Sequence, residues 1–218
     1  MKKIIVIMGA PGAGKGTQSR LLEERLGLPQ ISTGDIFRAM REAQTPLAEE
    51  VRAIMKSGGL VPDEVTMKLV RERTGQMDCD GGYILDGFPR TAAQARMLEE
   101  LAIEQGKEIL AIAVEVPFEV LEKRMTGRRN CPVCKEIYNV YFKPPRFDNV
   151  CDLHPEAQLE HRSDDNSETV KARLVTFERD TRPLLDYYLN VGRLHRVDGL
   201  RDPELVYADI EKIVNSES

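Results

Sequence analysis

The sequence contains no long hydrophobic run, no internal repeat and no low-complexity segment. A membrane-spanning helix needs about 18 consecutive apolar residues, and no segment of this chain approaches that length. The first eight residues are basic and then apolar, but this run is too short for a signal peptide and leads directly into a glycine-rich loop. These absences argue against a membrane protein and predict a globular, cytoplasmic one.

An excess of positive charge is also absent, because the 218 residues carry a net charge of −5. A broad nucleic-acid-binding surface requires many clustered lysines and arginines, so we expect no nucleic-acid partner. Cysteines are few: Cys79 stands alone as a free thiol, and the other three fall between residues 131 and 151. The length allows one or two domains with a substantial core.

Short apolar segments alternate with helical patterns along the chain. The expected strands are residues 4–8, 29–32, 83–85, 109–116 and 194–197. The expected helices are residues 17–26, 62–72, 92–105, 117–125 and 203–214, with one more after a capping-box sequence at 165–168. This alternation predicts an α/β fold with a five-stranded parallel sheet covered by helices on both faces.

Two segments interrupt the alternation. Residues 32–61 contain two helical patterns, at 35–41 and 47–56, and no strand, which predicts a small helical insertion. Residues 127–165 lack helical periodicity and contain four prolines and three of the four cysteines. Because a structureless loop of this length is improbable inside a compact domain, the second insertion should have a stabilising device of its own.

The most informative motif is Gly-Ala-Pro-Gly-Ala-Gly-Lys-Gly-Thr at residues 9–17, between the first strand and the first helix. Such a loop can direct successive backbone N–H groups at an anion. The helix N-terminus adds a partial positive charge, and Lys15 adds a full one. The motif predicts binding of a polyphosphate such as ATP or GTP. Its hydroxyl stands at Thr17, one place later than in the common Gly-Lys-Ser/Thr form, and an ordinary glycine-containing turn is the alternative.

The second insertion contains two paired-ligand sequences, Cys131-Pro-Val-Cys134 and Cys151-Asp-Leu-His154, with sixteen residues between Cys134 and Cys151. This spacing is typical of a tetrahedral Cys3His zinc site. Since all four ligands come from the protein, the zinc should be structural. Two alternatives are a redox-active Cys131–Cys134 pair and His161 as the fourth ligand, at a less favourable spacing.

A second set of residues suits phosphate chemistry. Asp86 ends a predicted buried strand, where its carboxylate can hold Mg²⁺ or its waters beside the glycine-rich loop. Phosphoryl transfer between two polyanions needs charge neutralisation and in-line positioning more than it needs an acid or a base. Arginines that could neutralise this charge concentrate near the boundaries of the two insertions: Arg38, Arg90, Arg124, Arg128, Arg129, Arg162 and Arg173.

Together these motifs resemble the adenylate kinase family in its bacterial form, with a long zinc-bearing lid. The resemblance rests on residues 9–17, 30–35, 85–90, 94, 127–129 and 162–170 and covers essentially the whole chain. It implies a P-loop nucleoside monophosphate kinase fold and an ATP:AMP phosphotransferase, monomeric, that transfers the terminal phosphoryl group of MgATP reversibly to AMP. The implied domains are a core (1–31, 62–126 and 166–218), an AMP-binding domain (32–61) and a lid (127–165). The position of Thr17 is the family's own form of the loop.

The resemblance also implies roles for individual residues. ATP would be held by Gly12, Ala13, Gly14, Lys15, Gly16 and Thr17, and contacted by Arg124, Arg128, Ile137, Tyr138 and the main chain near Arg201. AMP would be held by Thr33, Arg38, Gly59, Leu60, Val61, Gly87, Phe88, Pro89, Arg90 and Gln94, with Gln94 recognising the adenine edge. Arg162 and Arg173 would reach the phosphate of AMP and the migrating phosphoryl group. The catalytic set would be Lys15, Asp86, Arg90, Arg128, Arg162 and Arg173. Two positions depart from the family pattern: His154 replaces a common Cys or Asp, and Lys135 a common glycine.

Three other functions are compatible with parts of the sequence. Another nucleoside monophosphate kinase is the nearest, and the long lid and Gln94 favour AMP over its competitors. A zinc-ribbon nucleic-acid-binding NTPase is disfavoured by the acidic balance and by the lack of a basic stripe around residues 131–154. A nucleotide-dependent switch protein would hold or hydrolyse GTP without any acceptor.

Overall fold

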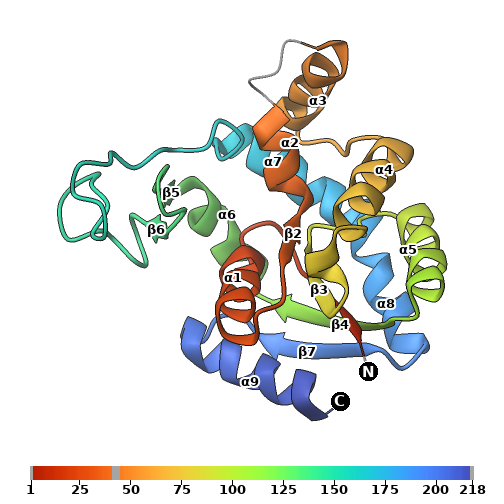
Figure 1. Cartoon of the computed structure of the whole chain (residues 1–218). Coiled ribbons are helices and arrows are strands. Elements are labelled where there is room, and N and C mark those ends of the chain that lie inside the picture. Colours follow the sequence, from red (N-terminus) through yellow and green to blue (C-terminus); the bar gives the residue numbers. More distant parts are fainter. Residues whose placement is uncertain (1, 41–44, 217–218) are drawn as a thin grey trace.

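The central sheet has five parallel strands in the order β2–β3–β1–β4–β7 (Figure 1). The structure is a computed structural model and describes residues 2–40 and 45–216. The strands are β1 (Lys3–Met8), β2 (Gln30–Ser32), β3 (Gly82–Asp86), β4 (Glu108–Glu115) and β7 (Leu194–Asp198). All five match the predicted segments to within one or two residues. β1 lies at the centre, paired with β3 and β4, and its six residues are all buried.

Alternate residues of β1 separate the core into two halves, one on each face of the sheet. Ile4 and Val6 face helices α4 (Asp63–Thr74), α5 (Ala92–Gln105) and α8 (Pro183–Asn190). Ile5 and Ile7 face α1 (Lys15–Leu26), α6 (Phe118–Thr126), α7 (Ser167–Thr176) and α9 (Pro203–Ser216). This two-sided burial explains the continuous apolar sequence of β1, since a strand covered on both faces has no polar side. No helix in the described part of the chain is both long and apolar enough to cross a membrane.

The helical segment after residue 166 is longer than the sequence indicated. Asn166 accepts a hydrogen bond from Thr169 N–H and so caps α7, as the capping-box sequence predicts. The helix then continues through a π-helical turn, η3 (Phe177–Thr181), into α8. A separate short turn, η2 (Met77–Cys79), precedes β3.

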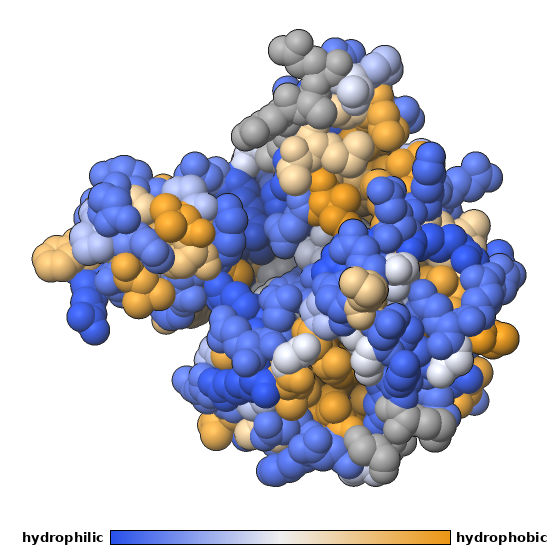
Figure 2. Space-filling view, in the orientation of Figure 1, coloured by the Kyte–Doolittle hydropathy of each residue, from blue (hydrophilic) through white to orange (hydrophobic). Residues whose placement is uncertain are grey.

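The helical insertion, residues 32–61, contains α2 (Thr33–Ala39) and α3 (Pro46–Ser57), each capped by a hydroxyl, from Ser32 and Thr45. The predicted end of the first helix, at Arg41, lies outside the described residues. The second insertion, residues 127–165, contains a two-stranded antiparallel ribbon of β5 (Arg128–Asn130) and β6 (Ile137–Asn139). The two insertions project from the sheet in different directions (Figure 1). A hollow lined by hydrophilic residues separates the second insertion from the rest of the molecule (Figure 2).

Candidate active site

The phosphate loop leaves β1 and approaches the neighbouring strand so closely that only glycine fits at its start. Gly9 has φ +140°, and a Cβ there would lie 2.4 Å from the Val114 carbonyl oxygen. Gly14 precedes α1 in the left-handed region, with φ 104°. Within the described chain, no side chain caps the N-terminus of α1 and no acidic residue lies in its first turn. The positive end of the helix dipole is therefore left for an external anion.

Lys15 lies at the start of α1 and turns back onto this loop. Its Nζ donates to the carbonyl oxygens of Gly9 at 2.9 Å and Ala10 at 3.0 Å. Burial lowers the pKa of Lys15 to about 8; nearby Asp86 opposes this shift, and the Arg90 guanidinium adds to it. An incoming polyanion would stabilise the charged ammonium and draw it away from the loop carbonyls.

Asp86 ends β3 beside the same loop, as the sequence predicts. A Cβ built on Gly16 would meet the Asp86 Oδ2 at 3.4 Å, and Gln30 Nε2 lies 3.4 Å from that oxygen. A carboxylate this close to the phosphate loop is a hard oxygen ligand of the kind that Mg²⁺ accepts, directly or through its waters. The residues present therefore fit a magnesium–nucleotide complex.

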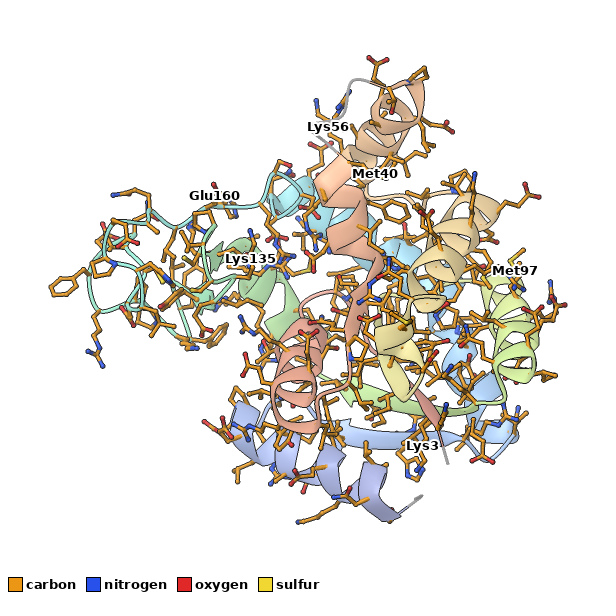
Figure 3. All side chains as sticks on the ribbon, in the orientation of Figure 1. Lys3, Met40, Lys56, Met97, Lys135 and Glu160 are labelled. Atoms are coloured by element: carbon orange, nitrogen blue, oxygen red, sulfur yellow. The ribbon has the colours of Figure 1, made fainter. Side chains whose placement is uncertain are left out.

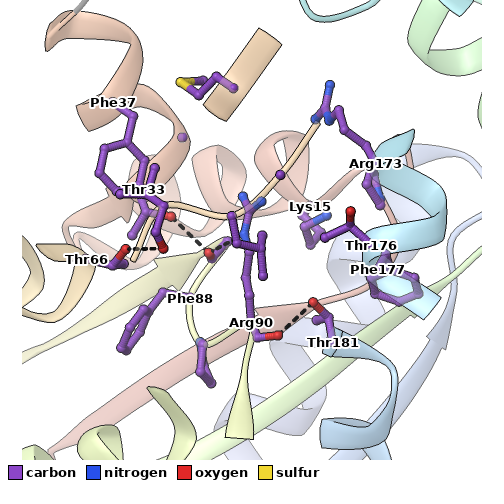
Figure 4. A pocket seen from close by; sticks show the side chains of 18 of the residues that line it. Lys15, Thr33, Phe37, Thr66, Phe88, Arg90, Arg173, Thr176, Phe177 and Thr181 are labelled. Atoms are coloured by element: carbon purple, nitrogen blue, oxygen red, sulfur yellow. Dashed lines mark hydrogen bonds between the residues drawn. The ribbon is translucent and has the colours of Figure 1, made fainter. Parts of the chain in front are cut away.

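A cavity opens between the phosphate loop and the helical insertion (Figure 4). One wall is the loop after β3, where Arg90 Nε donates to the Gly87 carbonyl at 2.7 Å and Thr33 Oγ1 donates to the same oxygen at 2.9 Å. The cavity brings together most of the residues that the sequence assigned to the acceptor: Thr33, Arg38, Gly59, Leu60, Val61, Gly87, Phe88, Pro89, Arg90, Gln94 and Arg173. Lys15 also lines this cavity, so the cavity joins the phosphate loop to this set.

Gln94 lines the cavity, but the amide group of its side chain already has partners. Its Oε1 accepts from Arg90 N–H at 2.8 Å, and its Nε2 donates to Asp63 Oδ1 at 2.8 Å. The other oxygen of Asp63 accepts from the Thr91 hydroxyl at 2.9 Å. A base that bonded to Gln94 would have to share or replace these contacts. Asp63 was not predicted as a site residue, because it appears in the sequence only as an acidic residue in the first turn of a helix.

Two adjacent buried carboxylates hold Arg128 and Arg173, of which Arg173 lines the cavity and Arg128 does not. Arg128 donates to both oxygens of Asp165, at 2.8 and 2.6 Å, and Asp165 is fully buried. Arg173 donates to Asp164 Oδ2 at 3.1 Å and to Asp165 Oδ1 at 3.2 Å. These carboxylates were missed as site residues. The signal that could have found them is the adjacent acidic pair that closely follows Arg162.

The local electrostatic environment favours a bound anion. Burial lowers the pKa of Arg162 to about 9 and that of Arg173 to about 10, and neighbouring guanidinium groups act in the same direction. Burial also lowers the pKa of Arg90. Cations packed this closely are stabilised when a polyphosphate enters, since opposite charge restores their ordinary pKa. Arg38 is paired with Asp35 at 2.6 Å and would exchange that exposed carboxylate for a phosphate.

The predicted ATP contacts outside the loop are only partly assembled. Arg124 lies against the phosphate loop and donates to Gly199 O at 2.9 Å and Ala13 O at 3.4 Å. Arg201 is exposed, paired with Asp209, just beyond that Gly199 turn. In β6 the Tyr138 side chain is buried against Cys151 rather than turned to the phosphate loop. An ATP contact from Tyr138 would therefore fall to its main chain, or to Ile137 beside it.

The four predicted zinc ligands converge in the second insertion. Ligand atoms of Cys131, Cys134, Cys151 and His154 all lie within 4.8 Å of one another. Cys134 Sγ is 3.7 Å from Cys151 Sγ, and two thiolates on one tetrahedral zinc would lie about 3.8 Å apart. Within the described residues this cluster does not include His161. The donor set therefore fits zinc, with His154 as the fourth ligand.

The chemistry around Cys151 also suits a metal. Burial alone would raise the pKa of this thiol, but hydrogen bonds from the Tyr138 hydroxyl, the Leu153 N–H and His154 lower it to about 6. A thiol with this pKa is a thiolate at neutral pH, which is the form that binds zinc. Apart from the metal ligands, the second insertion has only a small buried cluster, of Tyr138, Ala157 and Leu159. A metal bound by this cluster would supply the stabilising device that the composition predicts.

Lys135 occupies the turn after Cys134, where the family resemblance led us to expect glycine. Its φ is +60°, in the left-handed region that glycine favours, and its N–H donates to Cys131 O at 3.1 Å. The turn is therefore formed despite the substitution, at a strain of about 1 kcal/mol. Its carbonyl accepts from Arg20 on α1 at 2.9 Å, and Arg20 also pairs with Glu136 at 3.4 Å. Lys135 thus lies on the side of the second insertion that faces α1 (Figure 3).

Comparison with known proteins agrees with this geometry. The family model for adenylate kinase matches residues 7–193. The chain is 48% identical over 211 residues to an adenylate kinase of Bacillus subtilis, covering 96% of this chain and 97% of that protein. It is 47% identical over 213 residues to one of Syntrophomonas wolfei (97% and 99% covered) and 45% identical over 212 residues to one of Nitrosococcus oceani (97% and 98% covered).

The chain belongs to the adenylate kinase family. Its enzyme class is that of the ATP:AMP phosphotransferases, and its fold is the α/β fold of this family. Of the alternatives left open by the sequence, the zinc-ribbon NTPase and the nucleotide switch are set aside by this membership.

Proposed function

We propose that this chain catalyses reversible transfer of the terminal phosphoryl group of MgATP to AMP, giving two ADP, and so interconverts adenine nucleotides. The observation that carries the proposal is the single cavity bounded by Lys15 of the phosphate loop and by Arg38, Arg90 and Arg173. A donor loop and an acceptor site that face each other across one cavity suit transfer between two nucleotides better than hydrolysis by a single one.

The donor phosphates would bind at the N-terminus of α1. The loop residues Gly12 to Thr17 would supply backbone N–H groups, and Lys15 would follow the phosphoryl group as it moves. Arg124, the main chain near Arg201, and Ile137 with Tyr138 of the second insertion would contact the rest of ATP. Bound Mg²⁺ would neutralise charge on the donor phosphates, and Asp86 would hold it or its waters.

The acceptor would occupy the side of the cavity formed by the helical insertion and the loop after β3. Arg38 and Arg90 would bind the AMP phosphate, and Thr33, residues 59–61 and residues 87–89 would enclose the nucleotide. Gln94 would recognise the adenine edge, with Asp63 holding its amide in position.

Catalysis would depend on positioning and charge rather than on an acid or a base. Arg128, Arg162 and Arg173 would close on the transferring group from the second insertion and α7, and Asp164 and Asp165 would keep two of these side chains oriented. Closure of both insertions would exclude water, which would otherwise accept the phosphoryl group.

The two insertions would act as separate covers on one core. We propose boundaries at residues 32–61 for the AMP-binding domain and 127–165 for the lid, with 1–31, 62–126 and 166–218 as the core. A structural zinc at Cys131, Cys134, Cys151 and His154 would fold the lid. Because one chain supplies both nucleotide sites, we propose that the enzyme works as a monomer in the cytoplasm.

Acceptor specificity tests the proposal. The rate of ADP formation from ATP is measured with AMP, CMP, UMP and GMP in turn, in the presence of Mg²⁺. We expect AMP to be preferred strongly over the other three. Equal rates with CMP or UMP would identify another nucleoside monophosphate kinase, and ATP consumption that does not depend on any acceptor would overturn the proposal.

A further inference from the structure

The helix that carries Arg173 contains one irregular turn beside the acceptor cavity. In η3 (Phe177–Thr181), Arg182 N–H donates to the Phe177 carbonyl five residues back, at 2.8 Å. A regular α-helix bonds four residues back, so this π turn includes one extra residue. Such turns are rare and are frequently found at functional sites.

The extra residue decides which side chain faces the cavity. Thr181 follows Arg173 by eight residues and would point about 80° away from it in a regular α-helix, which turns 100° per residue. Absorbing one residue in the π turn brings the two side chains to within about 20° of each other. Thr181, Phe177 and Arg173 do line the same cavity.

Thr181 uses this position to contact the acceptor site. Its side chain is buried, and its hydroxyl donates to the main-chain oxygen of Arg90 at 2.9 Å (Figure 4). Arg90 is also held through its N–H by Gln94, at 2.8 Å, and through its guanidinium by Gly87 O, at 2.7 Å. Thr181 adds a third contact from a separate element, so it fixes the loop to the helix that carries Arg173.

We infer that Thr181 is a positioning residue for Arg90, placed there by the π turn of η3. It acts through the Arg90 main chain and not on the nucleotide itself. The inference rests on the proposed function, because the kinetic consequence falls on the acceptor that Arg90 would bind.

The first test compares T181V and T181S, with T74V as the matched control. Thr74 is also a buried helical threonine, on α4, and is absent from the cavity lining. Its hydroxyl donates to Arg71 O at 3.4 Å and accepts from Gln105 Nε2 at 3.3 Å. Losing one buried hydrogen bond should lower kcat/KM for AMP by about 3- to 10-fold in T181V, with KM for ATP unchanged. T181S should restore the wild-type value, and T74V should leave kcat/KM unchanged for both nucleotides. Equal losses for ATP and AMP, no loss in T181V, or failure of T181S to rescue would overturn the inference.

The second test asks whether the π turn sets the alignment. In a regular helix, position 180 rather than 181 would face the cavity, at about 20° from Arg173. The double variant D180T/T181A therefore moves the hydroxyl to the place that a regular helix would require, with D180T alone as control. We expect the double variant to have the same kinetics as T181A. If T181V does not fold, T181A takes its place in the first test. Recovery of wild-type kinetics in the double variant would refute the π-turn argument.

An NMR measurement that does not depend on enzyme activity tests this inference separately from the proposed function. The ¹⁵N signal of Arg90 Nε–H should shift in T181V and stay in place in T181S and T74V. A wild-type protein that is inactive on AMP would refute the proposed function, while this signal would still test the Thr181 contact. An unchanged Arg90 signal in T181V would overturn the inference whatever the activity.

Discussion

The buried ion pair between Arg128 and Asp165 offers a quantitative test of how the arginines are held. D165N keeps the shape of the side chain but removes a fully buried negative charge that bonds Arg128 through two oxygens, at 2.8 and 2.6 Å. Breaking one partner of a buried pair costs about 3 to 5 kcal/mol. Because the asparagine retains one acceptor oxygen and Asp164 remains beside Arg173, we expect D165N to lower the free energy of unfolding by about 2 to 4 kcal/mol.

The chain supplies a matched control with the same geometry on the surface. Arg179 donates to both oxygens of Asp180, at 2.8 and 2.7 Å, but the Arg179 side chain is 70% exposed and that of Asp180 26%. D180N removes the same charge and should cost less than about 1 kcal/mol. Urea unfolding of wild type, D165N and D180N measures both effects. If the two variants lose free energy of unfolding to within about 0.5 kcal/mol of each other, burial does not increase the contribution of the Arg128–Asp165 pair to stability.

Three further results are expected. K15M should abolish turnover while leaving the circular dichroism spectrum unchanged, and retained activity would remove Lys15 from the site. Because the folded pKa of Lys15, about 8, lies below its unfolded value of 10.5, the unfolded chain binds more protons between these values. Between pH 8 and 10.5 the free energy of unfolding of wild type relative to K15M should therefore rise. The wild-type kcat/KM for ATP should fall above pH about 8, because Lys15 loses its charge. Flat pH profiles would contradict both expectations. Metal analysis should find one zinc per chain in wild type and in H161A. H154A should contain less zinc and have a lower melting temperature. Equal zinc contents in H161A and H154A would exclude His154 as a ligand.

The sequence predicted the parts of the site that depend on local chemistry. The phosphate loop is encoded within nine residues between a buried strand and a helix, and the zinc ligands by two short spacings. The three central strands, β1, β3 and β4, were found because burial on both faces makes them apolar over most of their length. The placement of Asp86 followed from the rule that side chains at the carboxyl ends of parallel strands meet at one edge of the sheet.

The parts that the sequence did not reveal depend on contacts between distant segments. Asp165 and Asp164 look like solvated acids until the fold buries them against Arg128 and Arg173. Helix α8 was missed because its first residue, Pro183, follows a charged segment and resembles a helix stop, although proline is tolerated in the first turn. The π turn before it, η3, was not predicted either.

The fate of the terminal phosphoryl group of ATP shows most directly whether this enzyme transfers it to AMP. The enzyme is incubated with Mg²⁺, unlabelled AMP and ATP labelled in the γ-phosphoryl group, and the products are separated. We expect the label to enter ADP as its β-phosphoryl group, with two ADP formed for each AMP consumed and no inorganic phosphate. Label released as inorganic phosphate, at a rate that AMP does not change, would contradict this expectation.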